Sequence, residues 1–254
     1  MRAVAVALFV PCFIDQFFPD VAIAALEVLE RLAVDVAVPD GAVCCGQPPA
    51  NAGFERNGVG ALHTLVDAFA PYDRVVVLSA SCAVHVRSHA AALGAAGARV
   101  ADRTTEFCAF LHDEVGVSGV GALNASYPKR VGLHIGCHGL RGLGLAKPSE
   151  LQGAPFNKVR ALLQTVRDLT FAELQRPDEC CGFGGTFALS EPAVSAKMGR
   201  DRLRDYALAR VDAVVSTDMS CLMHLAGLAR RGGSELPMLH VAEVLAGRVR
   251  VGAA

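Results

Sequence analysis

Apolar, β-branched runs alternate with segments of helical periodicity along the first half of the chain. Runs with the composition of buried parallel strands occupy residues 4–10, 34–38 and 74–78. Apolar positions at helical spacing fill residues 19–33 and 61–69, which lie between these runs. Strands that alternate with helices predict a parallel sheet whose connections are right-handed crossovers.

A second series with the same alternation follows. Its strand-like runs are residues 131–135, 168–171 and 213–216, and its helical patterns are 156–166, 192–209 and 220–230. The segment 116–129, between the two series, is rich in Gly, Ser, Asn and Pro and has no strong periodicity. We therefore predict an α/β fold of two pseudo-symmetric domains, residues 1–120 and 121–254, each with a small parallel sheet flanked by helices.

Three cysteine motifs recur in the same order in both halves. They are Cys12 and Cys137, Cys44-Cys45-Gly46 and Cys180-Cys181-Gly182, and Cys82 and Cys221. The intervals between the motifs are longer in the second half, which indicates longer loops. Thr105-Glu106-Phe107, before a short helix, resembles residues 240–244 near the other end of the chain. Cys108 alone has no counterpart, and we expect it to pack in the core as a small hydrophobic residue.

Charge and composition restrict the classes of function. The 254 residues include 24 basic and 25 acidic side chains, so the net charge of −1 provides no positive field for nucleic acid. The apolar runs are shorter than the roughly 18 to 20 residues of a membrane span. The amino-terminal run stops at Pro11 and is followed by Asp15, which favours a buried strand over a secretory leader.

The cysteine count points away from a disulfide scaffold. Nine cysteines, in a chain expected to reside in the reducing cytoplasm, indicate thiols kept for metals, redox chemistry or packing. The eight repeated cysteines each follow a predicted strand, and ligands of parallel sheets gather beyond the carboxyl ends of the strands. We therefore predict one four-thiol site in each half, with the ligands Cys12, Cys44, Cys45 and Cys82 in one half and Cys137, Cys180, Cys181 and Cys221 in the other.

The last cysteine of each set is predicted to begin a helix. Ser79 or Ser81 is the expected cap in the first half, and Thr217 or Ser220 in the second. Because a helix amino terminus stabilises a thiolate, we expect Cys82 and Cys221 to have lowered pKa values. His85 and His224 lie three residues after these cysteines, on the same helix face, and could approach the same sites. His138, beside Cys137, is a candidate hydrogen-bond donor.

The longer motifs resemble a known family. They are Cys44-Cys45-Gly46-Gln47-Pro48, the run CCGFGGTF at 180–187, Ser220-Cys221-Leu222, and HVAEVL at 240–245. With these motifs the chain resembles the CCG, or cysteine-rich-domain, group, to which a component of heterodisulfide reductase belongs, and more closely its lactate utilization protein A branch (LutA/YkgE). The resemblance implies an iron–sulfur subunit that acts in the cytoplasm with two companion proteins, LutB-like and LutC-like, in the oxidation of L-lactate to pyruvate.

One departure from the family pattern bears on the cofactor. The fullest CCG pattern ends in CxxC, but His85 and His224 stand where the second cysteine of that pair would be. Each half therefore offers four cysteines rather than five, which favours an ordinary [4Fe-4S] cluster in each half, or a site with His as a further ligand. No flavin or nicotinamide loop is evident, and no catalytic acid or base is predicted.

Two other functions fit the cysteines. Four thiolates also suit a structural zinc ion, although paired zinc sites usually have two CxxC-like knuckles, which this chain does not have. The vicinal pairs Cys44-Cys45 and Cys180-Cys181 could instead serve a metal-free thiol–disulfide reductase.

Overall fold

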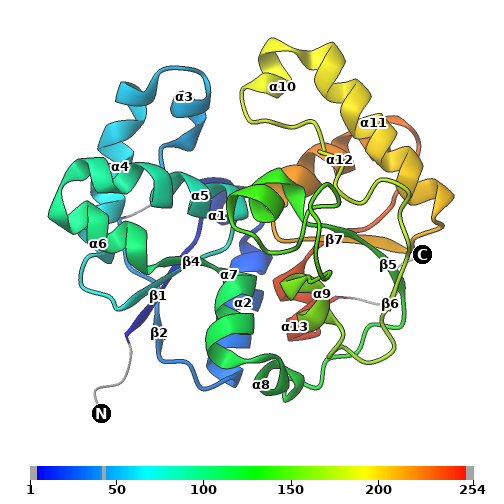
Figure 1. Ribbon diagram of the computed structural model, residues 1–254, viewed down its shortest axis with the longest axis horizontal. Coiled ribbons are helices and arrows are strands. Elements are labelled where there is room, and N and C mark those ends of the chain that lie inside the picture. The colour runs from blue at the N-terminus through cyan, green and yellow to red at the C-terminus, as the bar shows by residue number, and fades with distance from the viewer. Residues whose placement is uncertain (1–4, 42–43, 250–254) are drawn as a thin grey trace.

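The chain folds around two parallel β-sheets. The computed structural model describes residues 5–41 and 44–249, and Val4, the predicted start of the first strand, lies outside them. One sheet has the strand order β2-β1-β3-β4 and the other has the equivalent order β6-β5-β7-β8 (Figure 1). Every pairing between these strands is parallel. The predicted α/β class with two pseudo-symmetric halves is confirmed.

The bounds of the elements show how far the two halves repeat each other. The first half contains β1 (Val6–Phe9), α1 (Cys12–Phe17), α2 (Pro19–Arg31), β2 (Val36–Ala37), α3 (Gln47–Asn51), α4 (Glu55–Phe69), β3 (Arg74–Val77), α5 (Ala80–His89), η1 (Ala90–Leu93), α6 (Ala95–Arg103), β4 (Thr104–Glu106), α7 (Phe107–Phe110), η2 (Leu111–Val115) and α8 (Val117–Gly121). The second half contains β5 (Arg130–His134), η3 (His138–Gly142), α9 (Lys158–Leu163), β6 (Thr170–Phe171), α10 (Phe187–Ser190), α11 (Pro192–Leu208), β7 (Ala213–Ser216), α12 (Met219–Arg231), β8 (Met238–His240) and α13 (Val241–Ala246).

The six predicted strands are present, and each sheet has a fourth strand that the hydrophobic pattern did not predict. These additional strands, β4 and β8, are short edge strands without a long β-branched run. The predicted strands at 34–38 and 168–171 shorten to the two-residue strands β2 and β6. Both are also edge strands and pair on one side only, so fewer of their residues are held in the ladder.

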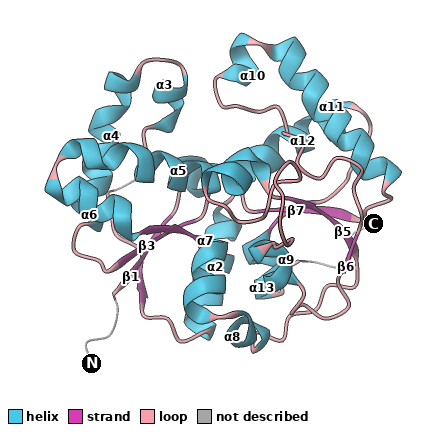
Figure 2. Cartoon of the chain, viewed as in Figure 1, coloured by secondary structure: helices cyan, strands magenta, loops and turns pink. Residues whose placement is uncertain are grey.

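The helices form layers on both faces of the sheets. Helices α2, α7, α9 and α13 pack together between the two sheets (Figure 2). In β1, Val6 and Leu8 point into this central core, whereas Ala7 and Phe9 point to the outer layer that contains α4. Helix α4 begins at Glu55, before its predicted start, and α9 is shorter than the pattern indicated.

Polar contacts add to the apolar packing between the halves. The guanidinium of Arg31 on α2 donates hydrogen bonds to the carbonyls of Leu123 and Ala246. The expected division at residue 120 falls within α8 and stays a prediction. No helix in the described part of the chain is long and apolar enough to span a membrane.

Candidate metal centre between the two halves

All eight repeated cysteines line a single cavity. This cavity has a volume of about 410 Å³ and lies at the carboxyl ends of the central strands of both sheets. Helix α3 of the first half and α10 of the second stand on opposite sides above it (Figure 1), and both contribute lining residues. The sequence predicted two separate sites, and the tertiary structure brings both into one cavity.

The first-half set is positioned by three strand ends. Cys12 begins α1 just after β1, Cys44 and Cys45 follow β2, and Cys82 lies in the first turn of α5. The thiol of Cys45 lies 3.2 Å from the sulfur of Cys82. Ser79, one of the two predicted caps, accepts a hydrogen bond from the backbone N–H of Cys82 at 3.4 Å.

The second-half set repeats this arrangement. Cys137 follows β5, and the thiol of Cys181 lies 3.0 Å from the sulfur of Cys221 in the first turn of α12. The cap of α12 is Asp218, which accepts from the backbone N–H of Ser220, so the prediction of Thr217 or Ser220 as the cap was wrong. Asp218 is the cap instead of Thr217 or Ser220 because aspartate, with its short carboxylate, is one of the preferred residues at this position.

A glycine after each vicinal pair allows the turn that directs both thiols to the cavity. Gly46 and Gly182 have the same left-handed φ of +87°, which disfavours any side chain. A Cβ on Gly46 would lie 2.5 Å from the carbonyl oxygen of Gly58, and one on Gly182 would lie 2.6 Å from that of Ser195. The backbone N–H groups of Gly46 and Gly182 lie 3.4 Å from the sulfurs of Cys44 and Cys180.

Hydrogen bonds make the thiols of each set unequal. Hydrogen bonding with Cys12 and Cys45 lowers the pKa of the Cys44 thiol far below its usual value and raises the pKa of the Cys12 and Cys45 thiols. Cys137 and Cys181 have the same relation to Cys180. The first thiol of each CCG turn is therefore the preferred thiolate, which is the form that binds metals.

The pKa expected for Cys221 was wrong. The thiol of Cys181 donates to Cys221 and lowers its pKa, but burial and the carboxylate of Asp218 together raise it above the usual value. The nearby acid opposes the helix amino terminus, which was the only influence that the sequence pattern revealed.

The two histidines that the sequence left open as further ligands do not line the cavity. His85 stacks on His89, with ring centroids 4.2 Å apart, and His224 places Nε2 3.5 Å from the hydroxyl of Ser195. Neither His85 nor His224 is among the residues that line the cavity. His138 does line it, with Nδ1 3.7 Å from the sulfur of Cys137, as expected of a hydrogen-bonding neighbour.

A different histidine, which the sequence analysis did not single out, lies against the second set. Like His85 and His224 it is not among the residues that line the cavity, but it lies behind two of the cysteines that do. His134 is the last residue of β5 and is 1% exposed, and its ring nitrogens have no hydrogen-bond partner among the described residues. Its ring and the sulfurs of Cys181 and Cys221 bring three donor atoms within 4.8 Å of one another. Burial lowers the pKa of His134 to about 3, so the imidazole is neutral. The sequence repeat could have drawn attention to His134. It aligns His134 with Phe9, since each lies three residues before the first cysteine of its half.

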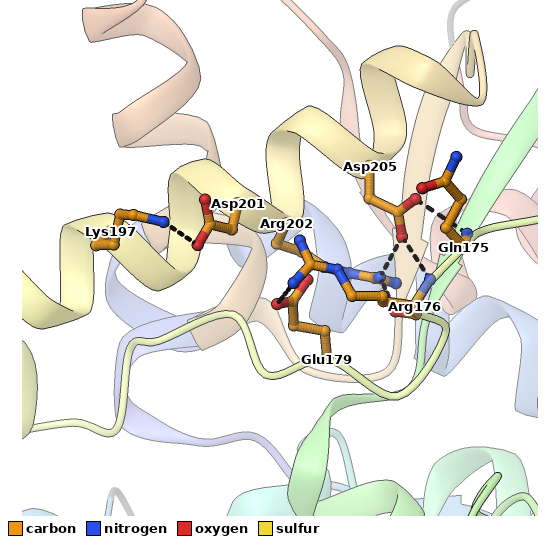
Figure 3. A network of polar contacts seen from close by, with 7 residues as sticks. All are labelled: Gln175, Arg176, Glu179, Lys197, Asp201, Arg202 and Asp205. Atoms are coloured by element: carbon orange, nitrogen blue, oxygen red, sulfur yellow. Dashed lines mark hydrogen bonds and ion pairs between the residues drawn. The ribbon is translucent and has the colours of Figure 1, made fainter.

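A buried ionic network holds the loop that leads into Cys180. The carboxylate of Asp205 accepts hydrogen bonds from the backbone N–H groups of Gln175 and Arg176 and from the guanidinium of Arg202 (Figure 3). Arg202 also donates to the Arg176 carbonyl and is fully buried. The network fixes this loop to α11 and thereby positions the second CCG turn.

Polar helix caps from both halves meet beneath the cavity. The carboxylate of Asp218 accepts from the backbone N–H of Ser81 at 3.0 Å and so links α12 to α5. Glu106 caps α7 and His240 caps α13, and both are fully buried. Burial raises the pKa of Glu106 to about 7 and lowers that of His240 to about 4.

The donor set fits an iron–sulfur group. Each half directs four thiols, all of them free, to the cavity, and thiolates are the protein ligands that hold such clusters. Cys108 is fully buried in the core away from this cavity, as predicted. Zinc shares the preference for thiolates, so the donor chemistry alone leaves both groups open.

Comparisons with known proteins agree with the duplicated architecture. The cysteine-rich domain family CCG matches residues 6–87 and again residues 131–226. Lactate utilization protein A 1 of Bacillus cereus (strain AH820) is 34% identical over 249 residues, which cover 96% of this chain and 99% of the relative. Lactate utilization protein A of Bacillus thuringiensis (strain Al Hakam) and lactate utilization protein A 2 of Bacillus anthracis (strain CDC 684 / NRRL 3495) match with the same identity and coverage. The chain therefore belongs to the lactate utilization protein A family of CCG cysteine-rich-domain proteins.

Proposed function

We propose that this protein is an iron–sulfur electron-transfer subunit in the oxidation of L-lactate to pyruvate. The names of its relatives support a role in lactate utilization. The observation that carries the electron-transfer role is the single cavity lined by eight free thiols, four from each half. Two thiolate-bound centres in one cavity would be close enough to exchange electrons and would share one opening to a partner.

The chain's own residues would hold and tune the two centres. The ligands would be Cys12, Cys44, Cys45 and Cys82 in one half and Cys137, Cys180, Cys181 and Cys221 in the other. When bound, a [4Fe-4S] cluster would accept and release one electron at a time. The backbone N–H groups of Gly46 and Gly182 donate toward the ligand sulfurs, and such hydrogen bonds stabilise the reduced, more negative state.

The substrate chemistry is assigned to partners. Conversion of lactate to pyruvate releases two electrons and two protons, and no acid or base in this chain is assigned to that step. We propose that LutB-like and LutC-like companion proteins complete the system in the cytoplasm. Helices α3 and α10 stand beside the cavity, so a partner that exchanges electrons would approach between them (Figure 1).

The decisive experiment measures iron and acid-labile sulfide per chain in protein purified without air, together with its electron paramagnetic resonance spectrum after reduction. Iron and sulfide in equal amounts, with a signal that appears on reduction, are the expected result. Zinc without iron would overturn the proposal in favour of a structural zinc protein.

A metal-free thiol–disulfide reductase stays the second candidate because of the short sulfur contacts. The Cys45–Cys82 and Cys181–Cys221 sulfurs lie 3.2 Å and 3.0 Å apart, so each pair could close to a disulfide with a small movement. This function requires thiols that react with a disulfide in protein without metal. The same preparation tests it, because bound iron would leave these thiols protected.

A further inference from the structure

His134 is a buried polar group without a partner. Its side chain has no access to solvent water, and its two nitrogens accept and donate no hydrogen bond among the described residues. Buried polar groups in folded proteins are nearly always paired, because an unpaired group loses its bonds to water without replacement. An orphaned imidazole beside a thiol site therefore indicates a partner that the polypeptide itself does not supply.

The geometry around His134 identifies where that partner would lie. A donor nitrogen of the ring and the sulfurs of Cys181 and Cys221 all lie within 4.8 Å of one another. A Cβ on Gly136 would lie 4.0 Å from Nε2 of His134 and 3.8 Å from the sulfur of Cys221, so Nε2 and this sulfur both border Gly136. The irons of one cluster could reach these donors at ordinary bond lengths, about 2.0 Å to nitrogen and about 2.3 Å to sulfur, after small side-chain rotations.

The first half cannot offer the same set. The repeat places Phe9 where the second half has His134, and the ring of Phe9 packs edge-on against Phe69. The thiol pair is otherwise equivalent, since Cys45 and Cys82 are as close as Cys181 and Cys221. Two donor nitrogens therefore distinguish the second set. One belongs to His134, where the first half has Phe9, and the other is Nδ1 of His138, which lies 3.7 Å from the sulfur of Cys137 where the first half has Phe13.

We propose that Nε2 of His134 ligates an iron of the second-half centre, beside Cys181 and Cys221, so that the two halves hold chemically different centres. This inference rests on the proposed iron–sulfur function. Each iron of a [4Fe-4S] cluster takes one ligand from the protein, so His134 would stand in place of one of the four second-half thiolates. A neutral imidazole in that place makes the centre less negative and raises its reduction potential. An electron that enters either centre would then reside mainly on the second-half centre. Electron transfer between the two centres would therefore run from the first half to the second.

The direct test detects magnetic coupling between a histidine nitrogen and the reduced centre. Protein containing iron and sulfide is prepared with ¹⁵N-labelled histidine and with unlabelled histidine, and pulsed electron paramagnetic resonance spectra are compared after reduction. We expect a strong nitrogen coupling that changes with the label. A coupling weak enough for a hydrogen bond, or no coupling, overturns the inference.

Variants assign the nitrogen to one residue. His134→Phe restores the residue of the first half and should remove the coupling and lower the higher of the two midpoint potentials. His224→Phe is the matched control, because His224 lies in the same half but turns Nε2 to Ser195, and both the coupling and the potentials should persist. An unchanged coupling in His134→Phe contradicts the assignment. If His134→Phe does not fold, His138→Phe supplies the assignment. It introduces the first-half residue at the other nearby imidazole and should keep the coupling, whereas loss of the coupling in His138→Phe would contradict the assignment to His134.

The design separates this inference from the function on which it rests. Iron and sulfide are measured on the same preparation before the spectra are recorded. The absence of iron and sulfide overturns both the proposed function and the inference that rests on it. Their presence, combined with a missing nitrogen coupling, overturns the histidine ligand alone and leaves the electron-transfer role standing.

Discussion

The two halves share a backbone plan but differ in what surrounds their thiols. In the first half, the outer face of the sheet is covered by Phe9, Leu65 and Phe69, which are all apolar and buried. At the equivalent positions the second half has His134, Arg202 and Tyr206, also buried. The equivalence of α4 and α11 follows from their contacts, because Gly58 and Ser195 make the same close approach to the glycine of each CCG turn.

This difference shows that duplication preserves the ligands while the supporting layer diverges. The polar set of the second half is internally connected, since Arg202 donates to the hydroxyl of Tyr206 at 2.9 Å. Gly132 makes room for that ring, because a Cβ there would lie 2.7 Å from Cδ1 of Tyr206. The first half needs no such space and has Ala7 instead. A polar layer can tune a metal centre through hydrogen bonds and charges, whereas an apolar layer acts through solvent access and the local dielectric constant.

The largest expected effect is the loss of one centre. Cys45→Ser should remove the iron of the first half and Cys181→Ser that of the second, each leaving the other half loaded, because serine is a far poorer iron ligand than thiolate. Iron and sulfide analysis measures the loss. Cys108→Ala is the control, since Cys108 is buried outside the cavity, and it should retain the full content. Full iron retention in Cys181→Ser would count against that ligand.

The next effect concerns the buried ion pair. Arg202→Leu introduces the residue of the first half and leaves the Asp205 carboxylate buried without its cation, so it should cost about 3 to 5 kcal/mol of unfolding free energy. Urea unfolding measures this cost. Lys197→Ala, on the exposed face of the same helix, removes the ion pair with Asp201 and should cost less than about 1 kcal/mol. Similar costs for the two variants would contradict the structural role given to Arg202.

A smaller effect is expected on the pH dependence of stability, to which the buried caps Glu106 and His240 contribute with opposite sign. The folded state raises the pKa of Glu106 to about 7, so it binds more protons than the unfolded chain between about pH 4.5 and 7, and stability falls as pH rises through that window. The folded state lowers the pKa of His240 to about 4, so stability falls as pH drops from about 6.5 to 4. The two slopes oppose each other.

Single variants should reveal each slope. Glu106→Gln keeps an acceptor for the cap and should make stability rise more steeply with pH between about 4.5 and 7. His240→Asn should make stability rise less steeply with pH between about 4 and 6.5. Each change is on the order of 3 kcal/mol, from about 1.4 kcal/mol per pKa unit. Urea unfolding at a series of pH values measures both, and a Glu106→Gln profile parallel to the wild type would refute the opposing-slope account.

Much of the fold was predictable because it depends on local pattern. The β-branched runs predicted β1, β3, β5 and β7, most of whose residues are buried. The pattern missed β4 and β8, which are short edge strands. It also favoured Thr217 or Ser220 over Asp218 as a cap, because which polar residue faces the first turn depends on the backbone path into the helix.

The candidate site also has features that the sequence predicted and features that it did not. The repeated cysteines and their glycines could be identified from the sequence alone, since a thiol before a left-handed turn is unusual and occurs twice. His134 could not be singled out, because a histidine inside a strand gives no sign of which face it occupies or what it meets. His85 and His224 have the spacing of ligands, yet His85 stacks on His89 and His224 places Nε2 beside the hydroxyl of Ser195.

The sequence by itself determined the duplication, the α/β class and the identity of the eight thiols, because strand composition and turn chemistry act over a few neighbouring residues. Only the tertiary structure decided that both thiol sets line one cavity and that an imidazole lies against one set. It also decided that the caps of the two halves meet beneath them. These relations join residues far apart in the chain, and they follow from the packing of the two sheets through α2, α7, α9 and α13, which no local pattern records.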